Sequence, residues 1–138
     1  TGPNHSGAKL HGFLSYLVKR VILEKKYTII GYDGFQVRDN IHSSDLGNCF
    51  WEYYKKPSNG VVYNIGGGEK CSCSVLEAIK IVEKKINTKV KIDFVKKART
   101  GDHIWWITDN TKFKKHFPKF KIKYNINTII EEIIENFQ

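Results

Sequence analysis

Two arginines stand out as residues that could bind an anionic group. The chain has 23 basic residues, and all except Arg20, Arg38 and Arg99 are lysines. Arg38 lies in an extended stretch, and Arg99 lies in a polar loop three residues before Asp102. A planar guanidinium forks around phosphate oxygens in a way that an ammonium cannot. Arg38 and Arg99 are therefore the first candidates for phosphate-binding residues, although charged loop residues are commonly only solvated.

A second segment resembles a phosphate-binding loop in its order of elements. Residues 61–65 are a short apolar run that favours a buried strand, and the glycines 66–68 follow before a helix. Phosphate loops are built in this order. The spacing matches neither G-x-G-x-x-G nor G-x-x-x-x-G-K-[ST]. We therefore expect a tight turn with close backbone packing, and no dinucleotide site at this loop.

The three cysteines do not indicate a metal site. Cys71 and Cys73 are closer together than a C-x₂₋₄-C zinc half-site allows, and no matching His/Cys pair follows. An odd number of cysteines without a secretory signal favours reduced thiols in the cytosol. We expect Cys49, Cys71 and Cys73 to be structural, and we predict no metal ligands.

The elements that must position these residues alternate between strands and helices. Asp33-Gly34 is a turn signal that would join strands 27–30 and 36–42 as a hairpin. A helix then opens at Ser43 or Ser44, with Phe50 among its inward residues, and Ser74-x-x-Glu77 is a capping box. The full pattern predicts helices at 8–25, 44–56, 74–87, near 111–113 and at 127–137, and strands at 27–30, 36–42, 61–65 and 90–95, with another short apolar run at 104–107. This is a mixed α/β domain.

Four segments together resemble one family. Residues 36–46 resemble Q-x-R-D-x-[IV]-H-V-x-D, residues 63–68 resemble Y-N-[IL]-G-G-G, and residues 99–102 resemble R-x-G-D. Gly2-Pro3 with Lys9-Leu10 resembles G-P…K-L. These motifs, in this order, are those of extended short-chain dehydrogenases/reductases, the NAD-dependent nucleotide-sugar epimerases and dehydratases. Within that family, the chain is most similar to the CDP-paratose/CDP-tyvelose 2-epimerases.

The resemblance implies a role for each motif. Arg38 and Arg99 would grip the nucleotide diphosphate, because its negative charges need two positive partners. Asp102 would contact the ribose or orient Arg99, and Asn64 would contact the substrate or fix its loop. The residues implied for the remainder of the nucleotide site are Lys9 and Leu10, with Thr28, Ile29 and Ile30 lining the base pocket.

The parts needed for catalysis are not found in the sequence. An epimerase of this family moves a hydride to NAD and back, which requires the Rossmann glycine fingerprint and a Tyr-x-x-x-Lys pair. No tyrosine of this chain has a lysine four residues later. We therefore expect residues 1–138 to be the substrate-binding C-terminal domain of an α/β, Rossmann-type enzyme. The resemblance places the NAD-binding half before Thr1, and it implies a nucleotide-diphosphate sugar as partner and a possible homodimer of the full-length enzyme. No catalytic residue is predicted in this chain.

Composition limits the alternatives. A net charge of +9 would suit a basic nucleic-acid-binding module if the basic residues clustered on one face. A 4,6-dehydratase of the same family is also open, because its distinguishing acidic residues would lie upstream. No apolar run approaches the roughly 20 residues of a membrane span, and no signal peptide is visible. We expect a cytoplasmic protein that binds neither nucleic acid nor membrane.

Overall fold

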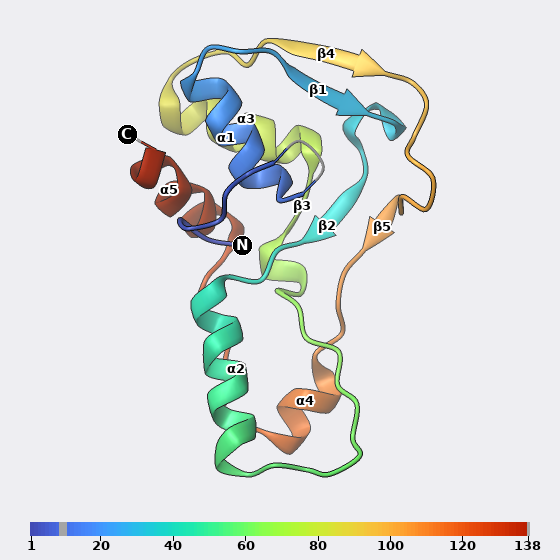
Figure 1. Ribbon diagram of the computed structural model, residues 1–138, viewed down its shortest axis with the longest axis vertical. Coiled ribbons are helices and arrows are strands. Elements are labelled where there is room, and N and C mark those ends of the chain that lie inside the picture. Colours follow the sequence, from blue (N-terminus) through green and yellow to red (C-terminus); the bar gives the residue numbers. More distant parts are fainter. Residues whose placement is uncertain (9–10, 138) are drawn as a thin grey trace.

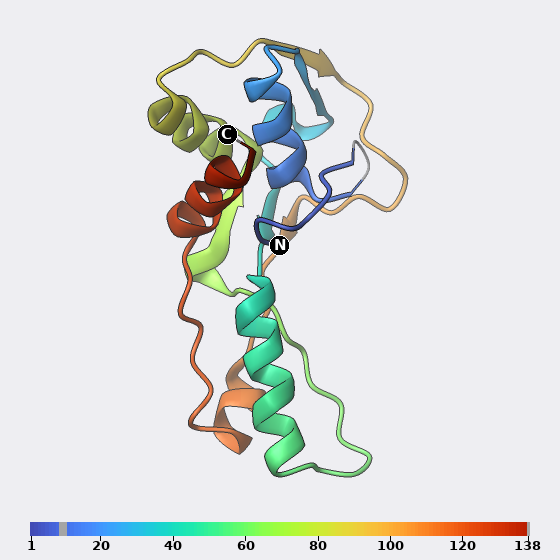
Figure 2. The same cartoon turned by 60° about the vertical axis from the view of Figure 1, so that its left-hand side comes forward.

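The computed structural model describes residues 1–8 and 11–137. Figure 1 shows an elongated molecule with most of its helices and its strands in the upper part. The lower part contains α2 (Ser43–Lys55) and α4 (Thr111–His116), and the turned view in Figure 2 shows the same separation. In the part of the chain that the structure describes, no helix is long and apolar enough to cross a membrane.

The strands form two separate sheets. In the first, β1 (Tyr27–Ile30) runs parallel to β4 (Ile92–Val95). In the second, β2 (Val37–Asp39) lies between β3 (Ser72–Ser74), which is antiparallel to it, and β5 (Trp105–Trp106), which is parallel. The element boundaries expected for 27–30 are confirmed.

The prediction that β1 and β2 form a hairpin is wrong, because the two strands pair with different partners. The turn that separates them is left-handed throughout: φ is 70° at Gly31, 51° at Tyr32, 50° at Asp33 and 86° at Gly34. A two-residue hairpin turn would bring the chain straight back. This longer turn, which contains the 3₁₀ segment η1 (Tyr32–Gly34), instead leads the chain into the second sheet.

The main core lies between the three upper helices and β1. These are α1 (Phe13–Ile22), α3 (Val75–Ile86) and α5 (Ile126–Phe137). Buried core residues include Leu14, Leu17, Val18, Ile29, Ala78, Val82, Ile129, Ile130 and Ile133. The isoleucine face predicted for the last helix is confirmed. The first helix is shorter than expected, because Gly12 is left-handed and Ala8 pairs with His11 in an isolated bridge.

The capping box predicted at the start of α3 is confirmed. The amide nitrogen of Glu77 donates to the hydroxyl of Ser74 at 3.1 Å, and the amide nitrogen of Ser74 donates to the carboxylate of Glu77 at 2.7 Å. Because each residue satisfies a free backbone donor of the other, the helix start needs no external anion.

The lower part has a small aromatic core of its own. Cys49 of α2 packs with Phe113, Phe117 and Phe120. Phe50, expected to face inward, is 64% exposed. Other departures from expectation lie in the extended segments. Residues 61–65, predicted as a strand, form no strand.

Candidate functional site: a cavity beside β1

The residues of the 36–46 motif divide into two groups, and the larger group holds the fold together. Asp39 Oδ2 accepts hydrogen bonds from the amides of Gly68 and Thr108, each at 3.1 Å. The carboxylate of Asp45 accepts from the amides of Lys123 and Tyr124, also at 3.1 Å. These contacts join segments far apart in sequence, so both carboxylates act as structural acceptors.

His42 and Asn40 belong to the same structural group. His42 Nδ1 accepts from the amide of Ser44 at the start of α2, and its Nε2 lies 3.0 Å from Glu132 of α5. Its ring stacks on Tyr124 with 3.7 Å between centroids. Asn40 donates to the carbonyl of Cys71. The motif therefore ties α2 to the upper part of the molecule.

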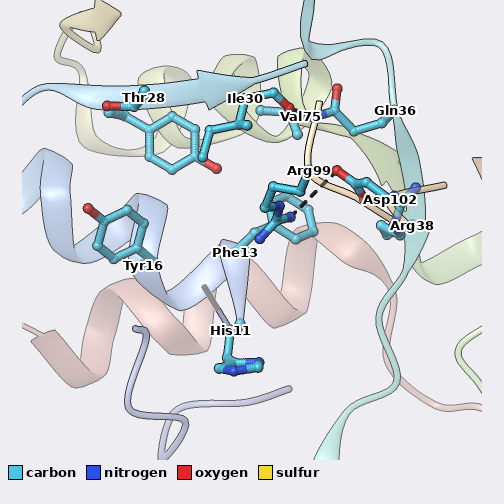
Figure 3. A pocket seen from close by; sticks show the side chains of 12 residues that line it. His11, Phe13, Tyr16, Thr28, Ile30, Gln36, Arg38, Val75, Arg99 and Asp102 are labelled. Carbon is cyan, nitrogen blue, oxygen red and sulfur yellow. Dashed lines mark hydrogen bonds and ion pairs between the residues drawn. The ribbon is translucent and has the colours of Figure 1, made fainter. Parts of the chain in front are cut away.

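The other group, Gln36 and Arg38, faces a cavity of about 200 Å³ between α1, β1 and the loop after β4. Figure 3 shows its lining side chains. These are His11, Gly12, Phe13, Tyr16, Tyr27, Thr28, Ile30, Gln36, Arg38, Val75, Arg99 and Asp102. The cavity brings together residues from five separate parts of the sequence.

Arg38 is held in place by several acceptors. Its Nη2 donates to Asp102 Oδ1 at 2.6 Å and to the carbonyl of His103, and its Nη1 donates to the carbonyl of Val37 at 2.7 Å. The Arg38 side chain is 24% exposed and that of Asp102 is 10% exposed. A partly buried guanidinium with a carboxylate partner is both oriented and charged.

Arg99 approaches the same carboxylate from the loop. Its Nη2 lies 3.6 Å from Asp102 Oδ2, and its side chain is 47% exposed. Figure 3 shows the Arg99 and Asp102 side chains close together, with Arg38 beside them. Two guanidinium groups thus share one carboxylate, which leaves a net positive charge at this end of the cavity.

The loop that carries Arg99 and Asp102 is fixed against the end of β1. The hydroxyl of Tyr32 donates to the carbonyl of Asp102 at 3.0 Å. A side chain at Gly31 would lie only 2.6 Å from Ala98, so the close approach of the two segments requires glycine there. The unusual backbone of residues 31–34 therefore brings the loop to the cavity.

The opposite end of the cavity is aromatic and apolar. Tyr16 and Tyr27 lie with ring centroids 5.9 Å apart, and Phe13 and Ile30 also line the cavity. Burial raises the pKa of Tyr27 to about 12, so this phenol is neutral near pH 7. An aromatic wall facing two guanidinium groups suits a ligand that combines a flat apolar part with an anionic part.

Five of the predicted site residues line this cavity: Thr28, Ile30, Arg38, Arg99 and Asp102. Ile29 does not, because alternation along β1 turns its side chain into the core, where it is 1% exposed. Asn64 is exposed and is not among the lining residues. Lys9 and Leu10 lie outside the described residues.

Sequence reasoning missed the cavity residues of α1 and its preceding turn. His11, Phe13 and Tyr16 fall within the helix predicted at 8–25, and nothing in their spacing marks a cavity. Gln36 could have been predicted as a cavity residue from the sequence, because it lies two residues before Arg38 on the same extended segment.

The glycine loop does not fit a dinucleotide. A side chain at Gly66 would lie 2.3 Å from Asp39 Oδ2, and one at Gly67 would lie 2.4 Å from Cys71 Cβ. The glycines therefore pack against protein groups, as the motif spacing indicated.

The cysteines are buried and unreactive. Burial raises the pKa of Cys49 and Cys71 to about 11 and that of Cys73 to about 12. Such thiols stay protonated near pH 7 and are poor nucleophiles. Within the described residues, no group of three His, Cys, Asp or Glu side chains could hold a metal ion.

Comparison with known proteins gives a family match over part of the chain. Residues 1–66 match the family model "NAD dependent epimerase/dehydratase family". This match covers just under half of the chain. The resemblance drawn from the four motifs is confirmed at this level. Comparison of the sequence with curated proteins gives no match.

Solved structures of epimerases and dehydratases share the fold. UDP-glucuronic acid 4-epimerase from Bacillus cereus, in complex with UDP-glucuronic acid and NAD, is 24% identical with a TM-score of 0.85, covering 100% of this chain and 43% of that one. MoeE5, in complex with UDP-glucuronic acid and NAD, is 23% identical with a TM-score of 0.87, covering 99% and 44%. dTDP-glucose 4,6-dehydratase from Bacillus anthracis, in complex with NAD, is 23% identical with a TM-score of 0.83, covering 99% and 41%.

These likenesses establish the fold. The α/β class predicted from the sequence, with short strands and helices like those of Rossmann-type epimerases, is confirmed. The chain spans less than half the length of each of these structures.

Proposed function

We propose that residues 1–138 bind the nucleotide diphosphate of a nucleotide sugar, as the substrate-binding domain of an NAD-dependent nucleotide-sugar epimerase. One observation carries this proposal: Arg38 and Arg99 meet at one end of a cavity whose other end is aromatic. A nucleoside diphosphate has the matching division, with a flat base at one end and negative charge at the other.

The arginines bind the diphosphate in this proposal. Arg38 is already oriented by Asp102, so little conformational entropy is lost when it binds the ligand. Arg99 is more exposed and turns from Asp102 toward the phosphates. Asp102 orients Arg38 throughout and orients Arg99 until the ligand binds. Tyr16, Thr28 and Ile30 form the wall against the base. Lys9, Leu10 and Asn64 remain proposed contacts of this substrate.

The reaction belongs to the whole enzyme in this proposal. The related structures named above are complexes with NAD, and two of them also contain UDP-glucuronic acid. Because the sequence contains neither the Rossmann glycine fingerprint nor a Tyr-x-x-x-Lys pair, NAD would be bound by another part of the enzyme. We expect this chain alone to be inactive and to bind NAD poorly. Detectable epimerisation by the isolated chain would contradict this division of roles.

The sugar and the base of the proposed substrate are inferred from two sequence motifs. Residues 101–106 and 31–39 resemble the CDP-paratose/CDP-tyvelose 2-epimerases, so we propose a CDP-hexose, epimerised through a transient keto intermediate, in a cytoplasmic and homodimeric enzyme. A 4,6-dehydratase is the second candidate, supported by the dTDP-glucose 4,6-dehydratase that shares the fold.

Isothermal titration calorimetry tests the binding proposal. The chain is titrated with CDP, UDP, dTDP and a short DNA duplex, and Arg38→Ala and Arg99→Ala are measured in parallel. We expect a nucleoside diphosphate to bind, and each variant to lose roughly tenfold or more in affinity, because hydrogen bonds to charged groups contribute about 1.5–3 kcal/mol.

A matched control separates specific contacts from net charge. Lys115→Ala removes one positive charge from an exposed position on α4, outside the cavity lining. It should leave nucleotide affinity nearly unchanged. Salt-sensitive DNA binding without a nucleotide signal would instead support a nucleic-acid-binding module.

A further inference from the structure

Strand β5 is an apolar edge of the second sheet. The strand order β3-β2-β5 places it at the margin of that sheet, where it pairs with β2 alone (Figure 1). The exposed fraction is 65% for Trp105, 52% for Trp106 and 58% for Ile104, the residue before the strand. Proteins usually protect an edge strand with charged residues, proline or a covering element, because an apolar edge pairs readily with another strand. The edge of β5 has none of these devices in its own sequence, so it fits a partner strand.

The backbone of Trp105 points toward the open side of this edge. Trp105 lies opposite Val37 of β2. The amide of Val37 donates to the carbonyl of Ile104 at 2.9 Å, so the carbonyl of Ile104 faces β2. Because backbone groups alternate in direction along a strand, the N–H and the C=O of Trp105 both point away from β2. One residue at the edge therefore presents a donor and an acceptor together.

This arrangement is complementary to itself. In an antiparallel pair, two residues that lie opposite each other in a hydrogen-bonded position exchange both of their N–H···O=C bonds. A two-fold axis beside Trp105 would bring it opposite Trp105 of a second copy, so that each donor meets an acceptor. The same register sets Ile104 against Trp106 of the second copy. One contact would then cover all three exposed side chains.

The side chain of Trp105 also borders a groove of about 510 Å³, which it lines together with Val37. The groove is separate from the cavity beside β1, since the two share no lining residue. The charged residues that line the groove are Glu69 and Glu77. The whole chain carries a net charge of +9, so a second copy that approaches here meets carboxylates rather than lysines. The charge of this face therefore favours a second copy over an anionic partner.

We propose that β5 is a dimerisation edge, at which two copies of this chain pair antiparallel about a two-fold axis and join their three-stranded sheets into one continuous sheet. A contact of this kind closes on itself and gives a dimer rather than a filament. A fully covered tryptophan buries about 150–250 Å². Four tryptophans thus bury less than about 1,200 Å², which is the range of weak and transient interfaces. The dissociation constant should accordingly be on the order of 10–100 µM.

Sedimentation velocity tests this contact without any nucleotide, so its result is independent of the proposed function of the cavity. The chain is measured from about 5 to 500 µM, a range that brackets the expected dissociation constant. The average mass should rise with concentration from that of one chain toward that of two. Trp105→Ser should raise the dissociation constant at least about tenfold, because buried tryptophans dominate such contacts.

Trp51→Ser is the matched control. This tryptophan of α2 is 57% exposed and lies outside β5, so its replacement should leave the dissociation constant unchanged. Amide exchange measured by NMR locates the contact: the amide of Trp105 should exchange more slowly at high than at low concentration, and the amide of Trp51 should not change.

Three results would overturn the proposal. The first is a mass that stays that of one chain up to about 500 µM, an observation that needs no variant to fold. The second is a dimer that Trp105→Ser leaves intact. The third is a dimer that Trp51→Ser abolishes, since α2 would then carry the contact.

Discussion

The guanidinium of Arg38 and the carboxylate of Asp102 meet at 2.6 Å, although 64 positions separate them in the sequence. Arg38 comes from β2, and Asp102 comes from the loop between β4 and β5. The contact fixes the arginine before any ligand arrives and attaches the loop to the second sheet. Both effects follow from one ion pair, so removing it should alter the stability and the mobility of the same region.

Replacing Asp102 should destabilise the protein. Asp102→Ala leaves the partly buried Arg38 without its charged partner, and we expect the free energy of unfolding to fall by roughly 1–3 kcal/mol. Urea denaturation measures this change. Glu135→Ala, which removes an exposed carboxylate of α5, is the control and should change the free energy by less than about 0.5 kcal/mol. Equal, small effects of both substitutions would contradict a structural role for the ion pair.

Alanine substitutions at Gly66 and Gly47 should change the stability of the protein in opposite directions. At Gly66 the new methyl group would lie 2.3 Å from Asp39 Oδ2 and from Thr108 Oγ1, so Gly66→Ala should cost roughly 1–3 kcal/mol. At Gly47, inside α2, nothing lies within 4 Å, so Gly47→Ala should stabilise the protein by about 0.5–1 kcal/mol. Thermal unfolding of both variants checks the prediction. A harmless Gly66→Ala would mean that the loop packs less closely than described.

The capping box of α3 should depend on pH. Hydrogen bonds from Ser74 hold the pKa of Glu77 below its usual 4.5. A pKa that is lower in the folded state contributes stability above the unfolded value, and this contribution is lost as the pH falls through the folded value. Glu77→Gln should therefore lower stability by about 0.5–1 kcal/mol near pH 7, with the difference from the unmodified chain vanishing in acid. A difference that is constant from pH 7 to pH 3 would contradict the assignment.

The thiols should react only when the chain unfolds. Cys73 is 4% exposed, and burial raises its pKa to about 12. Labelling with a disulfide reagent at pH 8 should be slow for all three cysteines and should become rapid across the urea transition. Fast labelling of one thiol in the folded protein would show that its segment opens locally.

The parts predicted correctly from the sequence are those set by local chemistry. The capping box at Ser74 and Glu77 and the apolar face of residues 126–137 depend on neighbouring residues of one helix. Only the resemblance to the family motifs implied that Arg38, Arg99 and Asp102 lie close together. No hydrophobic periodicity in the sequence relates residue 38 to residue 102.

The failures came from long-range pairing. Residues 61–65 have the composition of a strand, yet no described strand lies beside them, and Tyr63 and Ile65 pack on the aromatic core of the lower part instead. β1 and β2 have a turn signal between them, but their partners β4 and β3 decide which sheet each strand joins. Phe50 was expected on the apolar face of its helix, but its side chain is exposed in the structure.

The most direct test of the account is to map where a nucleotide binds. Hydrogen–deuterium exchange is measured on the chain with and without the diphosphate that binds most tightly. We predict slower exchange confined to residues 11–16, 27–39 and 96–104, which frame the cavity, and no change in α4 or in the loop at residues 66–68. Protection of residues 66–68 would contradict a nucleotide site in this cavity. So would protection of lysine-containing segments outside the cavity without protection at Arg38 and Arg99.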